Sequence, residues 1–293
     1  MNPLEKWLAA GPLVTDGAWG TQFERRGLEA GELADCWNLS HPERVEEVAA
    51  AYREAGSRVI LTNTFRSNPV ALAGYGAADA TEAINRAGVA ISRKAAAGQA
   101  LVFASLGPTG KLVTTGDIAP EEARAAFARQ AAALAAAGPD ALIFETMSDI
   151  EEAALALAAA RETGLPVVVS FAFDSGRKRD RTMTGATPEQ AARMAEEGGA
   201  AAVGANCGAG PAAFVEICKR LRAACALPLW LKPNAGLPTV TGGEVQYATS
   251  PEEFAASAAE LLSAGASFVG GCCGTGPEFI RALAKRAATC VSS

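Results

Sequence analysis

The segment ALIFETMSDIEEAALALAAARETGLPVVVSFAF (residues 141–173) contains two short apolar runs on either side of an alanine-rich stretch. The runs ALIFETM and VVVSFAF have the length and apolar content of buried strands. The stretch between them begins at Asp149, carries two glutamates in its first turn and ends at Gly164, which is typical of a helix. The segment therefore predicts a βαβ unit with parallel strands.

The same alternation repeats along the whole chain. Six further strands are predicted at LVTDGA from 13, VILTNTF from 59, LVFASLGP from 101, AAVGANC from 201, LPLWLKPNA from 227 and SFVGGCCG from 267. Helices are predicted between them, for example at 120–138 and 251–265, each with a proline start and a glycine stop. Eight strands that alternate with helices close a barrel, so the predicted fold is α/β, a single-domain (β/α)8 TIM barrel over residues 1–293.

The composition narrows the class of protein. Of 293 residues, 49% are hydrophobic and 20% are charged, which is enough apolar material for a large core and excludes a disordered chain. The formal net charge of −6 provides no basic surface, so we expect neither nucleic acid nor a membrane as partner. Because no apolar run is long enough to cross a bilayer and no export signal is evident, we expect a cytoplasmic protein with a small-molecule partner.

Polar and thiol side chains follow the predicted strands. In a (β/α)8 barrel the loops after the carboxyl ends of the strands converge on one mouth, which holds the active site. The residues at these ends are Asp16, Thr62, Asn63, Ser105, Gly107, Glu145, Thr146, Phe171, Asn206, Cys207, Lys232, Asn234, Cys272 and Cys273. Strands that are buried on both faces are usually apolar, so this polar set indicates a site. The polar segment 174–187 is predicted to be a loop over the mouth.

Three of the seven cysteines belong to this set. Cys207 ends the sixth strand, while Cys272 and Cys273 end the eighth, one intervening strand away around the ring. Adjacent residues of a strand point to opposite faces, but the neighbouring glycines allow the chain to leave the sheet, so the vicinal pair can share one metal ion. Three thiolates with one open position are typical of catalytic zinc. The pattern predicts a Zn2+ site that is open to a substrate thiol.

Plainer interpretations exist for the same residues. Free cysteines are often small buried apolar residues, which is what we expect of Cys36, Cys218, Cys225 and Cys290. Asp16 could belong to an Asp-Gly turn, and Glu145 could be a buried acid held by backbone N–H groups. Lys232 ends a strand where the Schiff-base lysine of an aldolase barrel could lie. A barrel whose cysteines hold a structural metal or sense redox state is a further alternative.

Seven motifs together resemble one family. They are DGAWGT (16–21), TNTF (62–65), LGPTG (106–110), FET (144–146), GANCGAGP (204–211), KPNAGLP (232–238) and GGCCGTGPEFI (270–280). The chain resembles the homocysteine S-methyltransferases, which include betaine-homocysteine methyltransferase and the homocysteine-binding module of cobalamin-dependent methionine synthase. The combination of the NC-G strand end with GGCCGT is specific to this family, whereas DGA or LGP alone would be a weak signal.

The resemblance implies an activity and a set of site residues. The activity is zinc-dependent transfer of a methyl group to the thiol of homocysteine, which gives methionine. The implied zinc ligands are Cys207, Cys272 and Cys273, with no catalytic residue beyond the metal site. The implied substrate-binding residues are Asp16 and Glu145 for the ammonium group, Gly17 and Ala18 through backbone groups, and Asn206 and Asn234 as polar support.

The chemistry agrees with this activity, but the methyl donor stays open. A thiol with a pKa of ~8.5 is mostly protonated at neutral pH, and coordination to zinc deprotonates it. The donor is expected to be a methylcorrinoid carried by another protein, or a small sulfonium such as S-methylmethionine. Betaine is not expected, because Arg66 and Thr146-Met147 stand where the betaine branch places aromatic residues around its quaternary amine. Methylation of another thiol or of a corrinoid partner is the alternative activity.

Overall fold

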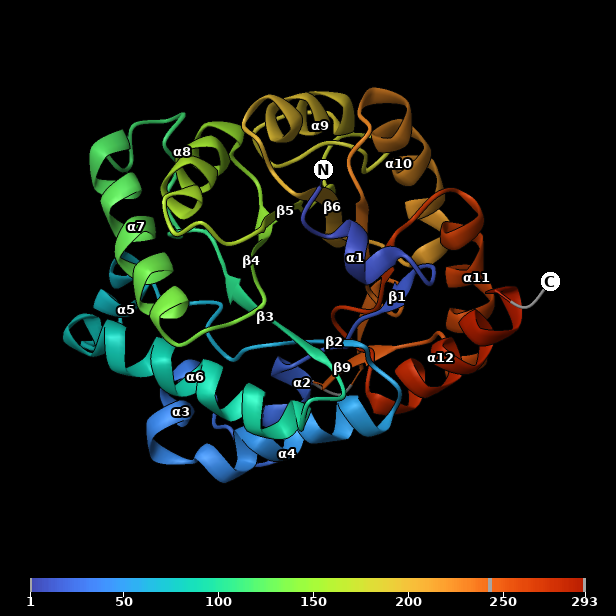
Figure 1. Cartoon of the computed structure of the whole chain (residues 1–293), viewed down its shortest axis with the longest axis horizontal. Helices are drawn as coiled ribbons and strands as arrows, with labels where there is room; N and C mark the ends of the chain where they lie inside the picture. Colours follow the sequence, from blue (N-terminus) through green and yellow to red (C-terminus); the bar gives the residue numbers. More distant parts are fainter. Residues whose placement is uncertain (1, 242–243, 292–293) are drawn as a thin grey trace.

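Eight parallel strands form one closed sheet in this computed structural model, which describes residues 2–241 and 244–291. Their order is β1, β10, β7, β6, β5, β4, β3, β2. The strands are β1 (Leu13–Val14), β2 (Val59–Leu61), β3 (Leu101–Leu106), β4 (Ala141–Met147), β5 (Val167–Phe171), β6 (Ala202–Cys207), β7 (Leu229–Pro233) and β10 (Phe268–Val269). A parallel bridge between Thr15 and Val59 joins the first strand to the second, so the sheet closes into a barrel (Figure 1). All eight predicted strands and the barrel fold are confirmed.

Helices surround the barrel on its outside (Figure 1). The longer helices are α4 (Pro42–Glu54), α6 (Thr81–Ala96), α7 (Pro120–Ala136), α8 (Ile150–Arg161), α9 (Pro188–Glu197), α10 (Pro211–Ala224), α11 (Pro251–Ser263) and α12 (Pro277–Val291). Short helices are α1 (Glu5–Leu8), α2 (Gly20–Glu24), α3 (Trp37–Ser40) and α5 (Pro69–Ala73). The predicted helices over 120–138, 149–164 and 251–265 correspond to α7, α8 and α11. Asp149 and Ser250 cap α8 and α11 by accepting hydrogen bonds from backbone N–H groups of the first turn.

Aromatic rings fill the barrel interior at the end where the strands begin. Trp230 of β7 stacks on Phe103 of β3 with 5.7 Å between ring centroids, and it lies 5.2 Å from the ring of Phe268. A side chain at Gly204 would collide with this layer, because a Cβ there would lie 1.8 Å from the carbonyl oxygen of Trp230. Trp7 of α1 packs on Phe103 with 5.7 Å between the ring centroids. The apolar layer and α1 therefore close this end of the barrel and leave the carboxyl ends of the strands as the mouth.

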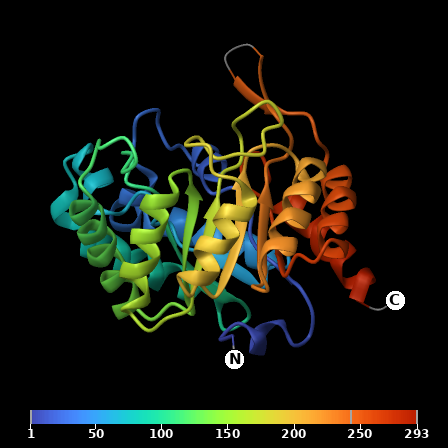
Figure 2. The ribbon, with the colours of Figure 1, turned by 90° about the horizontal axis from the view of Figure 1, so that it is seen from above.

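The mouth carries two projecting segments, which Figure 2 shows at the end opposite the N-terminus. One is the predicted loop 174–187, closed by an antiparallel bridge between Ser175 and Arg181. The other is an antiparallel hairpin, β8 (Pro238–Thr241) and β9 (Glu244–Tyr247), which was not predicted. The sequence signal for it is local, because the short runs PTVT and EVQY are separated by a Gly-Gly dipeptide that is typical of hairpin turns, and it lies outside the βα pattern.

The cysteines outside the mouth only partly match the expectation of buried apolar residues. Cys218 is buried, Cys36 and Cys225 are half-buried, and the side chain of Cys290 lies outside the described residues. No helix in the described part of the chain combines the length and the apolar character needed to cross a membrane.

Candidate metal centre and substrate pocket

The three predicted thiols meet at the mouth. The Sγ atom of Cys207 lies 3.2 Å from that of Cys272 and 3.9 Å from that of Cys273, and all three sulfur atoms lie within 4.8 Å of one another. Thiolates bound tetrahedrally at about 2.3 Å from zinc are about 3.8 Å apart, so the cluster has the dimensions of one zinc site. Within the described residues, no other group of three Cys, His, Asp or Glu side chains is close enough to hold a metal ion.

The backbone leaves the regular sheet at each of these ligands. Cys207 adopts a left-handed conformation with φ of 62°, which turns the end of β6 toward the mouth. Behind the vicinal pair, a side chain at Gly271 would collide with Thr275, since a Cβ there would lie 2.2 Å from the threonine hydroxyl oxygen. Glycine at 271 therefore allows the chain to fold tightly before it reaches Cys272.

Asn234 connects the two loops that carry the thiols. Its Nδ2 donates to the carbonyl oxygen of Gly208 at 2.7 Å, and its Oδ1 accepts from the backbone N–H of Cys273 at 2.9 Å. The side chain is 7% exposed and lies between the loops rather than in the cavity. Asn234 therefore sets the relative position of Cys207 and Cys273.

Replacing Asn234 with alanine is expected to weaken zinc affinity by about 10- to 100-fold, the usual cost of losing a residue that orients metal ligands. Competition with a chelator would measure the change. Asn85→Ala is the matched control, because Asn85 is also buried and donates to the backbone, at Ser67 and Thr81, far from the thiols. Equal zinc affinity in both variants would contradict the bridging role.

The thiols also influence one another's ionisation. Hydrogen bonding within the cluster raises the pKa of Cys207 and lowers the pKa of Cys273. The hydroxyl of Tyr247, at the end of β9, is a further hydrogen-bond partner of Cys273. Tyr247 was missed in the sequence because the hairpin that brings it to the site was not predicted, although the Gly-Gly dipeptide between PTVT and EVQY is a signal for one. The hydrogen bond with Cys207 lowers the pKa of Cys272, but its hydrogen bond with Cys273 and burial outweigh this and raise that pKa to about 11. Cys273 is therefore the member of the cluster that most readily becomes a thiolate.

Asp16 is fully buried behind the mouth and is held entirely by the protein. Its Oδ1 accepts from Lys232 Nζ at 2.6 Å. Its Oδ2 accepts from Trp19 Nε1 at 2.7 Å and from the backbone N–H of Leu61 at 2.8 Å. The structure thus places a lysine ammonium on the carboxylate that the family resemblance assigns to the ammonium group of the substrate. Neither the lysine contact nor the tryptophan contact was predicted.

Glu145 lies on the cavity wall, at an irregularity in β4. The register of β4 against β5 shifts between Phe144 and Met147, and Thr146 has φ of 60°. Asn206 supports this turn, since its Oδ1 accepts from the backbone N–H of Thr146 at 2.8 Å and its Nδ2 donates to the threonine hydroxyl at 2.7 Å. Such bulges re-aim side chains near active sites, and this one directs Glu145 into the mouth.

Burial and mutual charge shift the pKa values of Lys232 and Glu145. Burial lowers the pKa of Lys232, but Asp16 and Glu145 outweigh it and raise that pKa to about 12. Burial raises the pKa of Glu145 to about 7, against the opposing effect of Lys232. Because Schiff-base formation needs a neutral amine, the ion pair of Lys232 with Asp16 argues against the aldolase alternative.

The raised pKa of Glu145 makes stability depend on pH. Folded Glu145 titrates near pH 7 and the unfolded residue near 4.5, so the folded state binds the extra proton between these values. Wild type should therefore lose up to roughly 3 kcal/mol of unfolding free energy relative to Glu145→Gln as pH rises from about 4.5 to 7. Urea unfolding across this range would measure the difference. Glu121→Gln, at an exposed glutamate of α7, should follow wild type, and parallel curves for all three proteins would refute the prediction.

A cavity of about 430 Å³ joins the acidic group to the thiols. Its walls include Gly17, Ala18, Glu145, Asn206, Lys232 and the three cysteines, whereas Asp16 and Asn234 lie behind them. Both backbone polar groups of Ala18 already have partners within the protein. Its N–H donates to the carbonyl oxygen of Thr275 at 2.8 Å, and its carbonyl oxygen accepts from the Tyr52 hydroxyl. The cavity is also lined by Trp19, Phe23, Glu32, Asp35, Phe65 and Arg66, of which only Arg66 was singled out from sequence.

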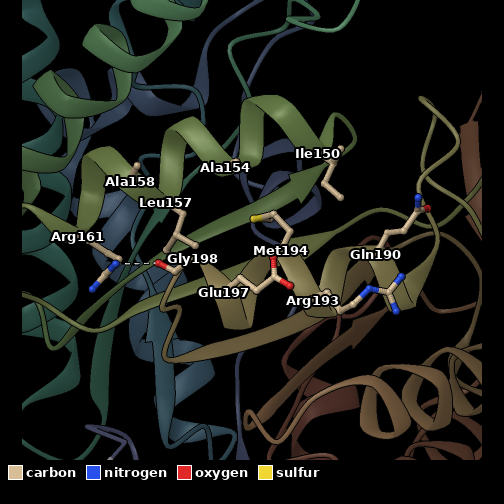
Figure 3. Close-up of a pocket in the computed structure, with 10 residues that line it drawn as sticks. All are labelled: Ile150, Ala154, Leu157, Ala158, Arg161, Gln190, Arg193, Met194, Glu197 and Gly198. Atoms are coloured by element: carbon tan, nitrogen blue, oxygen red, sulfur yellow. Dashed lines mark hydrogen bonds between the residues drawn. The ribbon is translucent and has the colours of Figure 1, made fainter.

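A second concavity, of about 630 Å³, lies on the outer wall between α8 and α9 (Figure 3). Leu157 and Met194 lie between the two helices, and Arg161 donates to the carbonyl oxygen of Gly198 at 2.9 Å. Its lining residues include no cysteine, histidine or aspartate, so they do not form a metal or nucleophile site.

A family model for homocysteine S-methyltransferases matches residues 13–287, which include the barrel strands, the three thiols and both acids. The chain belongs to the homocysteine S-methyltransferase family. The motif resemblance is thereby confirmed, and the cysteine triad is a zinc site of the kind typical of this family.

Relatives within the family differ in length. Methionine synthases from Mycobacterium leprae and Mycobacterium tuberculosis are 31% and 32% identical over 97% and 94% of this chain. The alignments cover only 25% and 24% of those proteins, so the chain spans about a quarter of their length. The metallated form of the homocysteine methyltransferase MmuM from Escherichia coli is 26% identical, with a TM-score of 0.80 over 97% of this chain and 100% of that one.

Proposed function

We propose that the chain methylates the thiol of homocysteine, giving methionine, with Zn2+ held by Cys207, Cys272 and Cys273. The observation that carries the proposal is the convergence of three thiols from two strands on a cavity that also holds a buried acid and a lysine. Family membership and the two groups of relatives support the choice of homocysteine. A cytoplasmic location and a single domain remain predictions from sequence.

The residues of the chain act mainly by positioning. When bound, zinc would keep the substrate sulfur as a thiolate at neutral pH, which a free thiol is not. Glu145, which lines the cavity, receives the substrate ammonium group, while its Oε2 accepts from the Ser105 hydroxyl at 2.9 Å. Direct contact of the ammonium with Asp16 would require Lys232 to move aside. The cavity walls then align the sulfur with the methyl carbon of the donor.

Side chains on the cavity wall support a choice of methyl donor. Trp19 and Phe65 are partly exposed aromatic side chains on this wall, and Glu32 adds an exposed carboxylate, a combination that favours a small cation. Betaine is still not expected, because Arg66 and Thr146-Met147 stand where the betaine branch places aromatic residues. We therefore place a small sulfonium such as S-methylmethionine first and a methylcorrinoid on a separate protein second.

A donor panel tests the proposed function. Zinc-loaded protein is incubated with homocysteine and, in separate reactions, S-methylmethionine, methylcobalamin or betaine, and methionine is measured. Formation of methionine with one donor supports the proposal, and S-methylmethionine is expected to be the most effective. Zinc-replete protein that is inactive with every donor would overturn it. Replacing homocysteine with other thiols in the same assay tests the alternative of a different acceptor.

A further inference from the structure

Two charged groups on the cavity wall have unused hydrogen-bonding capacity. Within the described residues, Lys232 Nζ donates only to Asp16 Oδ1, which leaves two of its three N–H donors available. Glu145 Oε1 lies 3.8 Å from Lys232 Nζ, while only the other oxygen of Glu145 accepts the Ser105 hydroxyl. Both side chains line the cavity that contains the three thiols. A lysine ammonium and a carboxyl group therefore stand side by side on the cavity wall.

Asp16 fixes Lys232 in this position. Trp19 and the backbone of Leu61 occupy one oxygen of Asp16, and the lysine occupies the other. Lys232 is 3% exposed, so its ammonium would be costly to bury without this carboxylate. The lysine is thus held as a cation whose remaining donors point away from Asp16.

The backbone offers the substrate less than the family resemblance implies. Ala18 N–H donates to Thr275 and its carbonyl accepts from Tyr52, so Ala18 has no free N–H for a ligand. A substrate carboxylate placed beside Asp16 and Glu145 would be repelled by both acids unless a cation intervened. Lys232 is the cation on this wall.

We propose that Lys232 binds the carboxylate of the amino-acid substrate while Glu145 binds its ammonium group, so that the pair recognises a zwitterion. In an α-amino acid these two groups are adjacent, and the 3.8 Å between Nζ and Oε1 matches a head group that bridges both. Asp16 then acts as a positioning residue through Lys232. The inference rests on the proposed function and specifies which thiols the same site accepts.

Binding of three thiols to cobalt-substituted protein, without any methyl donor, tests this assignment. The probes are homocysteine, 4-sulfanylbutanoate, which lacks the ammonium group, and 3-sulfanylpropan-1-amine, which lacks the carboxylate. The sulfur-to-cobalt absorption band reports binding independently of turnover. Wild type should bind the amine at least about tenfold more weakly than homocysteine, because a hydrogen-bonded ion pair is lost.

Two variants separate recognition from folding. Asp16→Asn combined with Lys232→Met removes both charges together and should reduce the preference for homocysteine over the amine to less than about twofold. Asp16→Asn alone keeps the lysine but sets an amide NH2 beside it, so this variant should reduce the preference less than the pair variant does. If both variants weaken all three thiols by the same factor, Lys232 has only a structural role and the proposal is overturned.

The remaining outcomes are also decisive. Tighter binding of 4-sulfanylbutanoate than of homocysteine by wild type would show that Lys232 repels the substrate ammonium group, and would overturn the zwitterion assignment alone. Failure of wild-type, cobalt-loaded protein to bind any of the three thiols would instead overturn the proposed function, because the metal site would then have no thiol substrate of this kind.

Discussion

Cys273→Ser is expected to abolish stoichiometric zinc binding and to lower methionine formation on the order of a thousandfold. The three thiols are spaced as the ligands of a single zinc ion. Replacing one of them with a hydroxyl leaves only two thiolate ligands for that ion. Without the metal the substrate thiol is mostly protonated and is no longer held in line with the donor. Metal analysis of the purified variant and the donor assay measure the two effects.

Cys225→Ser is the control for this experiment. Cys225 is a half-buried free cysteine at the end of α10, where its thiol donates to the carbonyl oxygen of Leu221. It should retain about one zinc per chain, as wild type does. A Cys273→Ser protein with full zinc content and full turnover would show that the triad is not the metal centre.

Asp16→Ala is expected to destabilise the fold by about 3–5 kcal/mol, the usual cost of leaving one partner of a buried ion pair uncompensated. The variant leaves the Lys232 ammonium almost fully buried with Glu145, 3.8 Å away, as its remaining acid. It also removes the acceptor for Trp19 and for the backbone of Leu61. Urea unfolding of the zinc-loaded protein at neutral pH measures the loss.

The pair variant Asp16→Asn with Lys232→Met controls for the ion pair itself. The amide oxygen at 16 can still accept from Trp19 and Leu61, and no lysine ammonium is left buried without its carboxylate. The pair variant should therefore be more stable than Asp16→Ala. Equal unfolding midpoints for wild type and Asp16→Ala would show that Asp16 does not stabilise the lysine.

Much of the site was predictable because, in a parallel barrel, residues at the carboxyl ends of the strands gather at one mouth. Cys207 and the pair Cys272 and Cys273 follow strands separated by one neighbour, and the carboxyl ends of parallel strands share one mouth. The left-handed turn at Cys207 and the hydrogen bonds of Asn234 were not predictable, since they depend on backbone angles and on contacts between separate loops.

Sequence alone determined the eight strands, the helices between them and the end of the barrel at which the thiols gather, because apolar periodicity and helix caps act over a few residues. Only the tertiary structure decided that Lys232 pairs with Asp16, 216 positions away, and that Tyr247 reaches Cys273. Those contacts depend on closure of β1 against β10 and β7 and on a local hairpin at the mouth. Which side chains pair over such distances along the chain depends on which ones meet when the barrel closes. The spacing of residues in the sequence does not predict these pairs.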